Sequence, residues 1–332
     1  MKKILIINTG GTLSAVVKQQ GMAPGLSTNE MLEELHMVSK NTELSMTDLC
    51  ALDSANIFPD DWAAIAAKVA ECKNDHDGIV IIHGTDTMAY TSSMLSFMLR
   101  NINIPVVITG SQLSISNPVA DATENLRCAI YMAASGYGGV FLAFNRKVML
   151  GCRASKVNTI SFDAFESINY PYIAEISSMG MQINDGMIPK KRGVFSLNTR
   201  YSDRIAAVKL FPGIDVSVFL SLKDKGYRAV YVEAYGLGGM PFIKKDITAA
   251  LGDLVSSGVF VLVGTQCMYG GSDLTVYETG RKALERGVAQ AHDMTSEAAV
   301  TKLMWVLGQT GDLKEIEEYF SIDLCGEVSI SI

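Results

Sequence analysis

Long apolar runs, paired cysteines and an excess of positive charge are all missing from this sequence of 332 residues. No run reaches the roughly 18 apolar residues of a membrane span, and the run Ile4 to Ile7 is too short for a signal peptide. The six cysteines form no C-x-x-C pair and no metal-ligand spacing with the four histidines, which is typical of reduced thiols in a cytoplasmic protein. A net charge of −7 argues against binding to nucleic acid.

Several catalytic motifs are absent as well. The sequence has no G-x-x-x-x-G-K-[ST] phosphate loop, no G-x-G-x-x-G fingerprint after a strand and no G-x-S-x-G nucleophile elbow. Four histidines leave few candidates for a histidine-based triad, and His83 follows a strongly apolar segment, which favours a structural role for it. Nucleotide binding and serine–histidine hydrolysis are therefore poorly supported.

Apolar segments alternate with helical patterns along the whole chain, and this alternation predicts an α/β fold. The length fits two domains. We expect a catalytic α/β domain over 1–185, a linker over 186–204 and a second α/β domain over 205–332. Strands are predicted at 4–7, 44–52, 79–82, 104–108, 139–145, 147–150, 206–210, 229–234 and 259–263, and helices at 28–36, 59–70, 88–100, 121–134, 216–222, 247–256 and 296–307. Leu13 to Leu26 is expected to form a loop or hairpin that acts as a lid.

Four of the predicted strands end in turns that carry hydroxyl, amide or carboxylate side chains. These turns are Asn8 to Thr12, Asp53-Ser54, His83 to Thr87 and Thr109 to Gln112. Asp86 or Thr87 alone could simply be the N-cap of the following helix. Ligands bind at the carboxyl ends of parallel strands, so four such turns together indicate a site.

Threonine, lysine and carboxylate side chains can build a nucleophile without histidine. A threonine hydroxyl needs a neighbouring base before it can attack, and a lysine whose pKa is lowered by burial could serve, oriented by an aspartate. Backbone N–H groups of the glycine turns could hold a developing oxyanion, a contribution of about 3 kcal/mol per donor elsewhere. Acyl transfer is the reaction class that these groups support.

The motifs themselves resemble the bacterial type I (cytoplasmic) L-asparaginases of the asparaginase/glutaminase family. The resemblance spans essentially the whole chain, and TGGT combined with HGTDT is highly specific. It is carried, in order, by Asn8-TGGT-Leu13, Leu52-Asp53-Ser54, His83-GTDTMAY-Thr91, Ile108-TGSQ-Leu113, Ala154-Ser155-Lys156 and Met294-Thr295-x-Glu297.

The resemblance implies hydrolysis of L-asparagine through a covalent acyl-enzyme, with no metal and no cofactor. By motif position Thr12 is the nucleophile, and Thr85, Asp86 and Lys156 activate it or the later water. Asp53 and Ser54 would bind the α-amino and α-carboxylate groups of the substrate, and backbone contacts would come from Gly11, Gly84 and Ser111. The implied fold is a larger amino-terminal doubly wound domain and a smaller flavodoxin-like carboxyl-terminal domain, both built on parallel sheets and assembled as a homodimer or homotetramer.

Two positions depart from the family pattern. Many members carry a lid tyrosine after TGGT, and this sequence has Met22 at about that position. In this respect it is similar to the Gram-positive branch of the type I enzymes, which usually has an apolar residue there. Some type I enzymes also bind a second asparagine as an activator, through an arginine and an asparagine near a T-Q-C segment. Glu233 and Gly239 stand at those two positions, which predicts weak or absent activation.

Two other interpretations compete with an asparaginase. The asparaginase-like subunit of an archaeal tRNA-dependent amidotransferase would need an extra amino-terminal domain and a basic surface, whereas this sequence begins almost directly with its first strand and is acidic. A catalytically silent amino-acid-binding module is disfavoured by the joint presence of Thr12, Asp53, Thr85, Asp86 and Lys156. Preference between asparagine and glutamine depends on one methylene, worth about 1–3 kcal/mol, and the resemblance favours asparagine.

Overall fold

The structure is a computed structural model that describes residues 1–18, 21–24 and 42–329. The chain divides into two compact units, residues 1–199 and 200–332. The expected linker, 186–204, overlaps this division. None of the described helices is long and apolar enough to cross a membrane.

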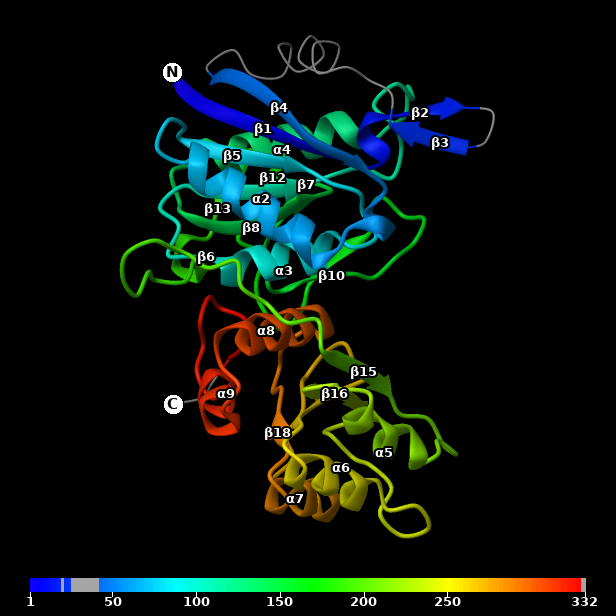
Figure 1. Ribbon diagram of the computed structural model, residues 1–332. Helices are drawn as coiled ribbons and strands as arrows, with labels where there is room; N and C mark the ends of the chain where they lie inside the picture. Colours follow the sequence, from blue (N-terminus) through cyan, green and yellow to red (C-terminus); the bar gives the residue numbers. More distant parts are fainter. Residues whose placement is uncertain (19–20, 25–41, 330–332) are drawn as a thin grey trace. The chain divides into compact units, whose positions relative to one another are not determined.

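An eight-stranded sheet forms the centre of the first unit (Figure 1). Its order is β13-β12-β9-β8-β7-β5-β1-β4. Five neighbouring strands are parallel: β4 (Thr42–Leu52), β1 (Lys2–Gly10), β5 (Gly78–Ile82), β7 (Pro105–Thr109) and β8 (Gly139–Phe144). The outer strands β9 (Lys147–Leu150), β12 (Ala174–Ser177) and β13 (Gly180–Ile183) are antiparallel, so the sheet is mixed rather than wholly parallel.

The antiparallel edge begins at the tight turn that the sequence predicts between residues 139 and 150. Asn145 and Arg146 both have positive φ, 47° and 63°, as a two-residue hairpin turn requires. This turn reverses the chain after β8, and β9, β12 and β13 each pair antiparallel to their neighbour. The sequence predicts β8 and β9, but it predicts neither β12 nor β13, whose residues are mostly exposed or half-buried.

Helices cover both faces of the sheet, as expected for a doubly wound domain. The helices α2 (Pro59–Cys72) and α3 (Met88–Met98) lie on one face, and α4 (Ala122–Ala133) lies on the other (Figure 1). All five residues of β5 and of β7 are buried because layers of helices cover both sides. All three helices were expected from the sequence.

Short elements complete the first unit. The strands β2 (Ala15–Lys18) and β3 (Gly21–Pro24) pair as a hairpin, one of the two forms expected for 13–26, while the expected helix at 28–36 lies outside the described residues. The strand β10 (Ala154–Lys156) pairs with β11 (Phe165–Ser167), and β6 (Leu99–Arg100) pairs with β14 (Ser196–Leu197). Three 3-10 turns are η1 (Thr12–Ser14), η2 (Ser54–Asn56) and η3 (Asp185–Met187).

The second unit contains a smaller, parallel sheet. Its four strands follow chain order: β15 (Ile205–Lys209), β16 (Ala229–Ala234), β17 (Phe260–Thr265) and β18 (Ala289–Gln290). The helices of the unit are α5 (Ser217–Asp224), α6 (Ile247–Ser256), α7 (Glu278–Glu285), α8 (Ser296–Gln309) and α9 (Leu313–Phe320). Two α/β domains, one larger and one smaller, are therefore confirmed.

A buried histidine joins β5 to the two helices on one face of the first sheet. His83 Nδ1 lies 2.7 Å from the Gly84 carbonyl oxygen, and a carbonyl only accepts, so Nδ1 carries the proton. The other nitrogen, Nε2, then accepts from the Thr91 hydroxyl at 2.9 Å, and that hydroxyl accepts from Trp62 Nε1 at 2.8 Å. Complete burial lowers the pKa of His83 from 6.5 to about 4, so the imidazole is neutral and structural, as the sequence favoured.

This neutral histidine predicts a loss of stability in mild acid. The unfolded chain takes up a proton near pH 6.5, whereas the folded chain does so only near pH 4, so the contribution is complete above pH 6.5 and is lost as the pH falls to 4. For His83→Gln we expect the free energy of unfolding in urea to fall less than that of the wild type between pH 7 and pH 4.5, by about 2 kcal/mol. Equal losses in both proteins would contradict the assignment.

Candidate active site

The four turns predicted as a site follow β1, β4, β5 and β7, which are parallel neighbours. Their carboxyl ends therefore meet at one edge of the sheet. Two of the turns approach each other through glycines, since a Cβ placed on Gly11 would lie 2.4 Å from Gly84 N and 2.6 Å from Gly84 Cα. Gly11 also has a φ of +85°, which side chains rarely tolerate. The TGGT and HGTDT motifs each carry a glycine at the point where their backbones touch.

Buried hydroxyls lock these strand ends to their neighbours. Thr9 donates to the Ile82 carbonyl at 2.7 Å, and Thr109 donates to the Ala143 carbonyl at 2.8 Å. Each threonine therefore ties its own strand to the next strand of the sheet. The first threonine of TGGT and that of TGSQ are structural, whereas Thr12 is left for chemistry.

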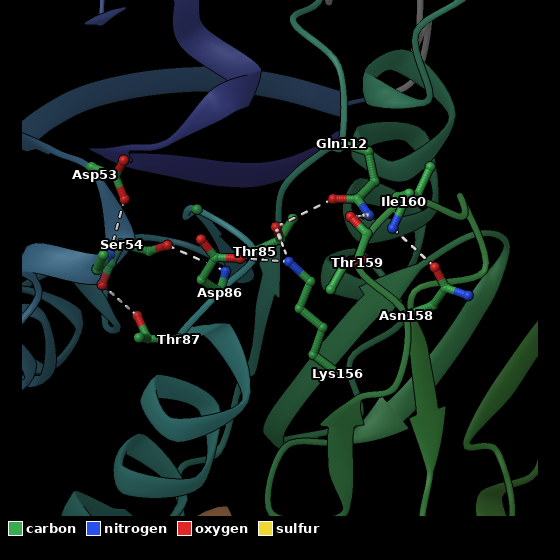
Figure 2. Close-up of polar contacts among 12 residues, drawn as sticks. Asp53, Ser54, Thr85, Asp86, Thr87, Gln112, Lys156, Asn158, Thr159 and Ile160 are labelled. Carbon is green, nitrogen blue, oxygen red and sulfur yellow. Dashed lines mark hydrogen bonds and ion pairs between the residues drawn. The ribbon is translucent and has the colours of Figure 1, made fainter. Parts of the chain in front are cut away.

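Lys156 joins two residues of the HGTDT turn (Figure 2). Its ammonium Nζ lies 2.9 Å from Thr85 Oγ1 and 2.6 Å from Asp86 Oδ1. Thr85 is 7% exposed and the Lys156 side chain 16%, while the Asp86 carboxylate is open to solvent. The lysine reaches the turn from β10, 70 residues beyond Asp86 in the sequence. The structure thus brings together three of the four predicted catalytic residues.

Thr12 enters the same region through its backbone. It begins η1, directly after Gly11 and therefore beside the Gly84 turn. Among the described residues it makes no hydrogen bond to Thr85, Asp86 or Lys156. The two candidate threonines therefore differ in their contacts, because Thr85 is hydrogen-bonded to Lys156 and Thr12 is not.

Asp53 and Ser54 follow β4, and Ser54 contacts the HGTDT turn. Ser54 Oγ accepts from Asp86 N at 3.2 Å, so the serine hydrogen can be donated to a ligand (Figure 2). The Ser54 carbonyl accepts from Thr87 Oγ1 at 2.7 Å, which excludes the reading of this threonine side chain as a helix cap. Asp53 Oδ1 accepts from Ala55 N at 2.9 Å, and the carboxylate is exposed to solvent. A carboxylate and a free hydroxyl hydrogen therefore lie side by side.

All three predicted backbone contributors are constrained. The Gly11 N–H donates to the Leu52 carbonyl at 3.0 Å, so any contact from Gly11 to a substrate comes from its carbonyl or its Cα. Ser111 is buried, and its hydroxyl donates to the Leu113 carbonyl within its own turn. Gly84 admits no side chain, since a Cβ there would lie 2.6 Å from Ser54 Oγ. These three residues shape the site through the backbone.

Gln112 is the residue that the sequence did not place among the site residues. Its Oε1 lies 3.3 Å from Thr85 Oγ1, and its Nε2 donates to the carbonyls of Thr159 and Ser161 at 3.2 and 3.1 Å (Figure 2). A signal was present, since Gln112 ends the fourth polar turn. The direction of its side chain, toward Thr85, needed the structure.

The described residues contain no group of histidine, cysteine, aspartate and glutamate that could hold a metal ion. The chemistry available from these residues is a hydroxyl nucleophile, a lysine proton carrier and an aspartate that orients the lysine. Such groups suit acyl transfer from an amide.

Both units match known family models. Residues 3–188 match the model described as Asparaginase, N-terminal, and residues 204–320 match Glutaminase/Asparaginase C-terminal domain. Over 329 residues the chain is 40% identical to an L-asparaginase of Thermococcus kodakarensis, with 98% of this chain and 99% of that protein covered. It is also 35% identical over 338 residues to one subunit of the glutamyl-tRNA(Gln) amidotransferase of Pyrococcus furiosus, covering 98% of this chain and 76% of that protein.

Solved structures agree with these matches. The thermostable L-asparaginase from Thermococcus kodakarensis has a TM-score of 0.92 at 40% identity, covering 99% of this chain and 100% of that chain. L-asparaginase I from Vibrio cholerae has a TM-score of 0.89 at 30% identity, covering 99% of each chain. With both units matched over nearly their full length, the chain belongs to the asparaginase/glutaminase family, and within it to the type I L-asparaginases.

Proposed function

We propose that this chain hydrolyses L-asparagine to L-aspartate and ammonia through an acyl-enzyme on Thr12. The observation that carries the proposal is the joining of Thr85, Asp86 and Lys156 by two hydrogen bonds, beside a turn that presents a second threonine. One threonine can then form the ester while the other, bonded to the lysine, moves protons.

In the first step Thr12 Oγ attacks the side-chain amide carbon of asparagine. The hydroxyl proton leaves Thr12 as the bond forms, and the amide nitrogen takes up a proton as the C–N bond breaks and ammonia departs. Lys156 is the group that carries this proton, and Asp86 keeps it in place through the 2.6 Å ion pair. The ammonium has no lone pair, so Lys156 must be a free amine at the moment when it accepts.

In the second step water attacks the ester. Thr85 accepts a proton from the water and gives its own to the Lys156 amine. Lys156 then returns a proton to Thr12 as the ester bond breaks, and L-aspartate is released. The Thr85 N–H, which has no partner among the described residues, is the donor that we propose for the oxyanion.

The amino-acid end of the substrate binds at the end of β4. The Asp53 carboxylate pairs with the α-ammonium group, and the Ser54 hydroxyl donates to the α-carboxylate. Gly11, Gly84 and Ser111 define the wall against which the substrate lies. This arrangement requires no metal ion and no cofactor.

The assembly and the location are also proposals. Following the family resemblance, we propose a cytoplasmic homodimer or homotetramer. Light scattering of the purified chain measures the mass directly, and a monomer at working concentration would contradict the assembly.

The amidotransferase relatives support a second candidate, because the chain is 35% identical to a subunit of one such enzyme. In that role the same site would supply ammonia to a partner protein. An asparaginase releases ammonia at full rate without any partner protein. Activity that depends on an added partner and tRNA would therefore favour this second candidate.

Replacing Thr12 tests the assignment of the nucleophile. We expect Thr12→Ala to lose at least about a thousandfold in ammonia release from L-asparagine, because no ester can form, while Thr12→Ser keeps measurable activity. The rate with L-glutamine as a parallel substrate measures the preference between the two amino acids. A chelator present in every assay removes any contribution from metal ions. A Thr12→Ala enzyme with near wild-type rates would assign the attack to Thr85 instead.

Glu233 generates a prediction about regulation. Its Oε1 accepts from the Ser296 hydroxyl at 2.7 Å, and its backbone carbonyl accepts from Gln266 Nε2 at 2.9 Å, so the position that some relatives fill with arginine carries an engaged carboxylate. A carboxylate repels the α-carboxylate of a second asparagine. We therefore expect a hyperbolic rate curve with rising asparagine, and a clearly sigmoidal curve would contradict this.

A further inference from the structure

The amide of Gln112 has an assigned orientation. Its nitrogen faces two backbone carbonyls, those of Thr159 and Ser161, and its oxygen faces the Thr85 hydroxyl. A flipped amide would place its oxygen against both carbonyls, so the neighbours exclude the reverse arrangement. Gln112 Oε1 is thus an acceptor aimed at Thr85.

The backbone beneath Gln112 is held from α4. The N–H groups of Gln112 and Leu113 both donate to the Asp121 carboxylate, at 3.0 to 3.1 Å. Asn125, one turn further, donates to that carboxylate and to the Gly110 carbonyl, each at 2.9 Å. The Asp121 contacts fix the backbone of Gln112, and the two bonds from its Nε2 to the carbonyls of Thr159 and Ser161 hold the side chain toward Thr85.

The direction of each hydrogen bond of Thr85 follows from the number of hydrogens that Lys156 and Thr85 can donate. The Lys156 ammonium has only donors, so Thr85 Oγ1 accepts from it at 2.9 Å. The single Thr85 hydrogen is left for Gln112 Oε1 at 3.3 Å. While Lys156 is protonated, the Thr85 hydrogen therefore points away from the lysine.

Hydrolysis requires the opposite arrangement. Once Lys156 has lost its proton, its lone pair can accept the Thr85 hydrogen, but only if the hydroxyl turns away from Gln112. We propose that Gln112 is a positioning residue: its Oε1 competes with the Lys156 amine for the Thr85 hydrogen and holds that hydrogen while Lys156 is protonated. The inference rests on the proposed function and adds a residue that acts on Thr85 without touching the substrate.

The same side chain links Thr85 to the loop of residues 158–161. Asn158 Oδ1 accepts from Ile160 N and Ser161 N at 2.9 and 2.8 Å, so the loop is a closed turn that presents its carbonyls to Gln112. Figure 2 shows this turn on the far side of Gln112 from Thr85. A change in the conformation of this turn would therefore move the Gln112 amide and alter its hydrogen bond with the Thr85 hydroxyl.

Two variants of Gln112 distinguish the effect of an added charge from the effect of losing the side-chain hydrogen bonds. Gln112→Met keeps the length of the side chain but removes its donors and acceptor. Gln112→Glu keeps an acceptor for Thr85, but it adds a negative charge beside the hydroxyl that also contacts the Lys156 ammonium. It also loses the amide hydrogens that are donated to the loop carbonyls. Gln182→Glu, the same substitution on the exposed side of β13, is the matched control.

We expect a different pH dependence of kcat for each variant. In Gln112→Glu the added negative charge favours the protonated state of the groups around Thr85, so the acid limb of the kcat profile moves up by about one pH unit and kcat at pH 7 falls about tenfold. In Gln112→Met kcat falls severalfold and the acid limb does not move up. KM changes less than twofold in both, since Asp53 and Ser54 still bind the substrate, and Gln182→Glu behaves as the wild type.

The outcomes are distinct. An active wild type with equal losses in both Gln112 variants and an unmoved acid limb would overturn this inference alone, because a purely structural role predicts that result. A wild type that releases no ammonia would overturn the proposed function and this inference with it. Thermal melting of each variant accompanies the kinetics, and an unshifted profile in a Gln112→Glu enzyme that melts like the wild type counts against the proposal.

Discussion

The site depends on the contact between the backbones of Gly11 and Gly84. Two turns can touch at this distance only if neither carries a side chain, and each glycine would clash with the other turn or with Ser54 if it had a Cβ. The contact places the threonine after Gly11 beside the threonine after Gly84. The parallel order of β4, β1, β5 and β7 supplies the shared edge, and the threonine bonds from Thr9 and Thr109 hold the strand ends in register.

Around that contact the polar groups form one continuous network. Ser54 binds the HGTDT turn from one side, and Lys156 and Gln112 bind Thr85 from the other. The His83 imidazole lies behind the turn and is fully buried, so it supports the Gly84 carbonyl but takes no part in proton transfer. The chemistry that we propose therefore uses hydroxyls, one lysine and one aspartate, and the histidine of the motif is a structural residue.

The sequence predicts much of this arrangement, for identifiable reasons. Short apolar runs bounded by polar turns predict the buried strands, so β1, β5 and β7 lie where expected. The motifs predict that Thr85, Asp86 and Lys156 belong together. Periodicity could not predict the outermost strands β12 and β13, because they are short and carry no buried apolar run. Nor could it predict that Gln112 rather than Ser111 reaches Thr85, since that depends on side-chain rotation about adjacent residues of one turn.

Detection of the covalent intermediate tests the central claim most directly. The Thr85→Ala enzyme, mixed with L-asparagine, quenched in acid and digested, should carry one aspartyl group on the peptide that contains Thr12, because Thr85 takes part only in the attack of water on the ester. Thr12→Ala should carry none under the same conditions. An aspartyl group on the peptide that contains Thr85, or product formed by the wild type with no covalent species on either threonine, would contradict the account.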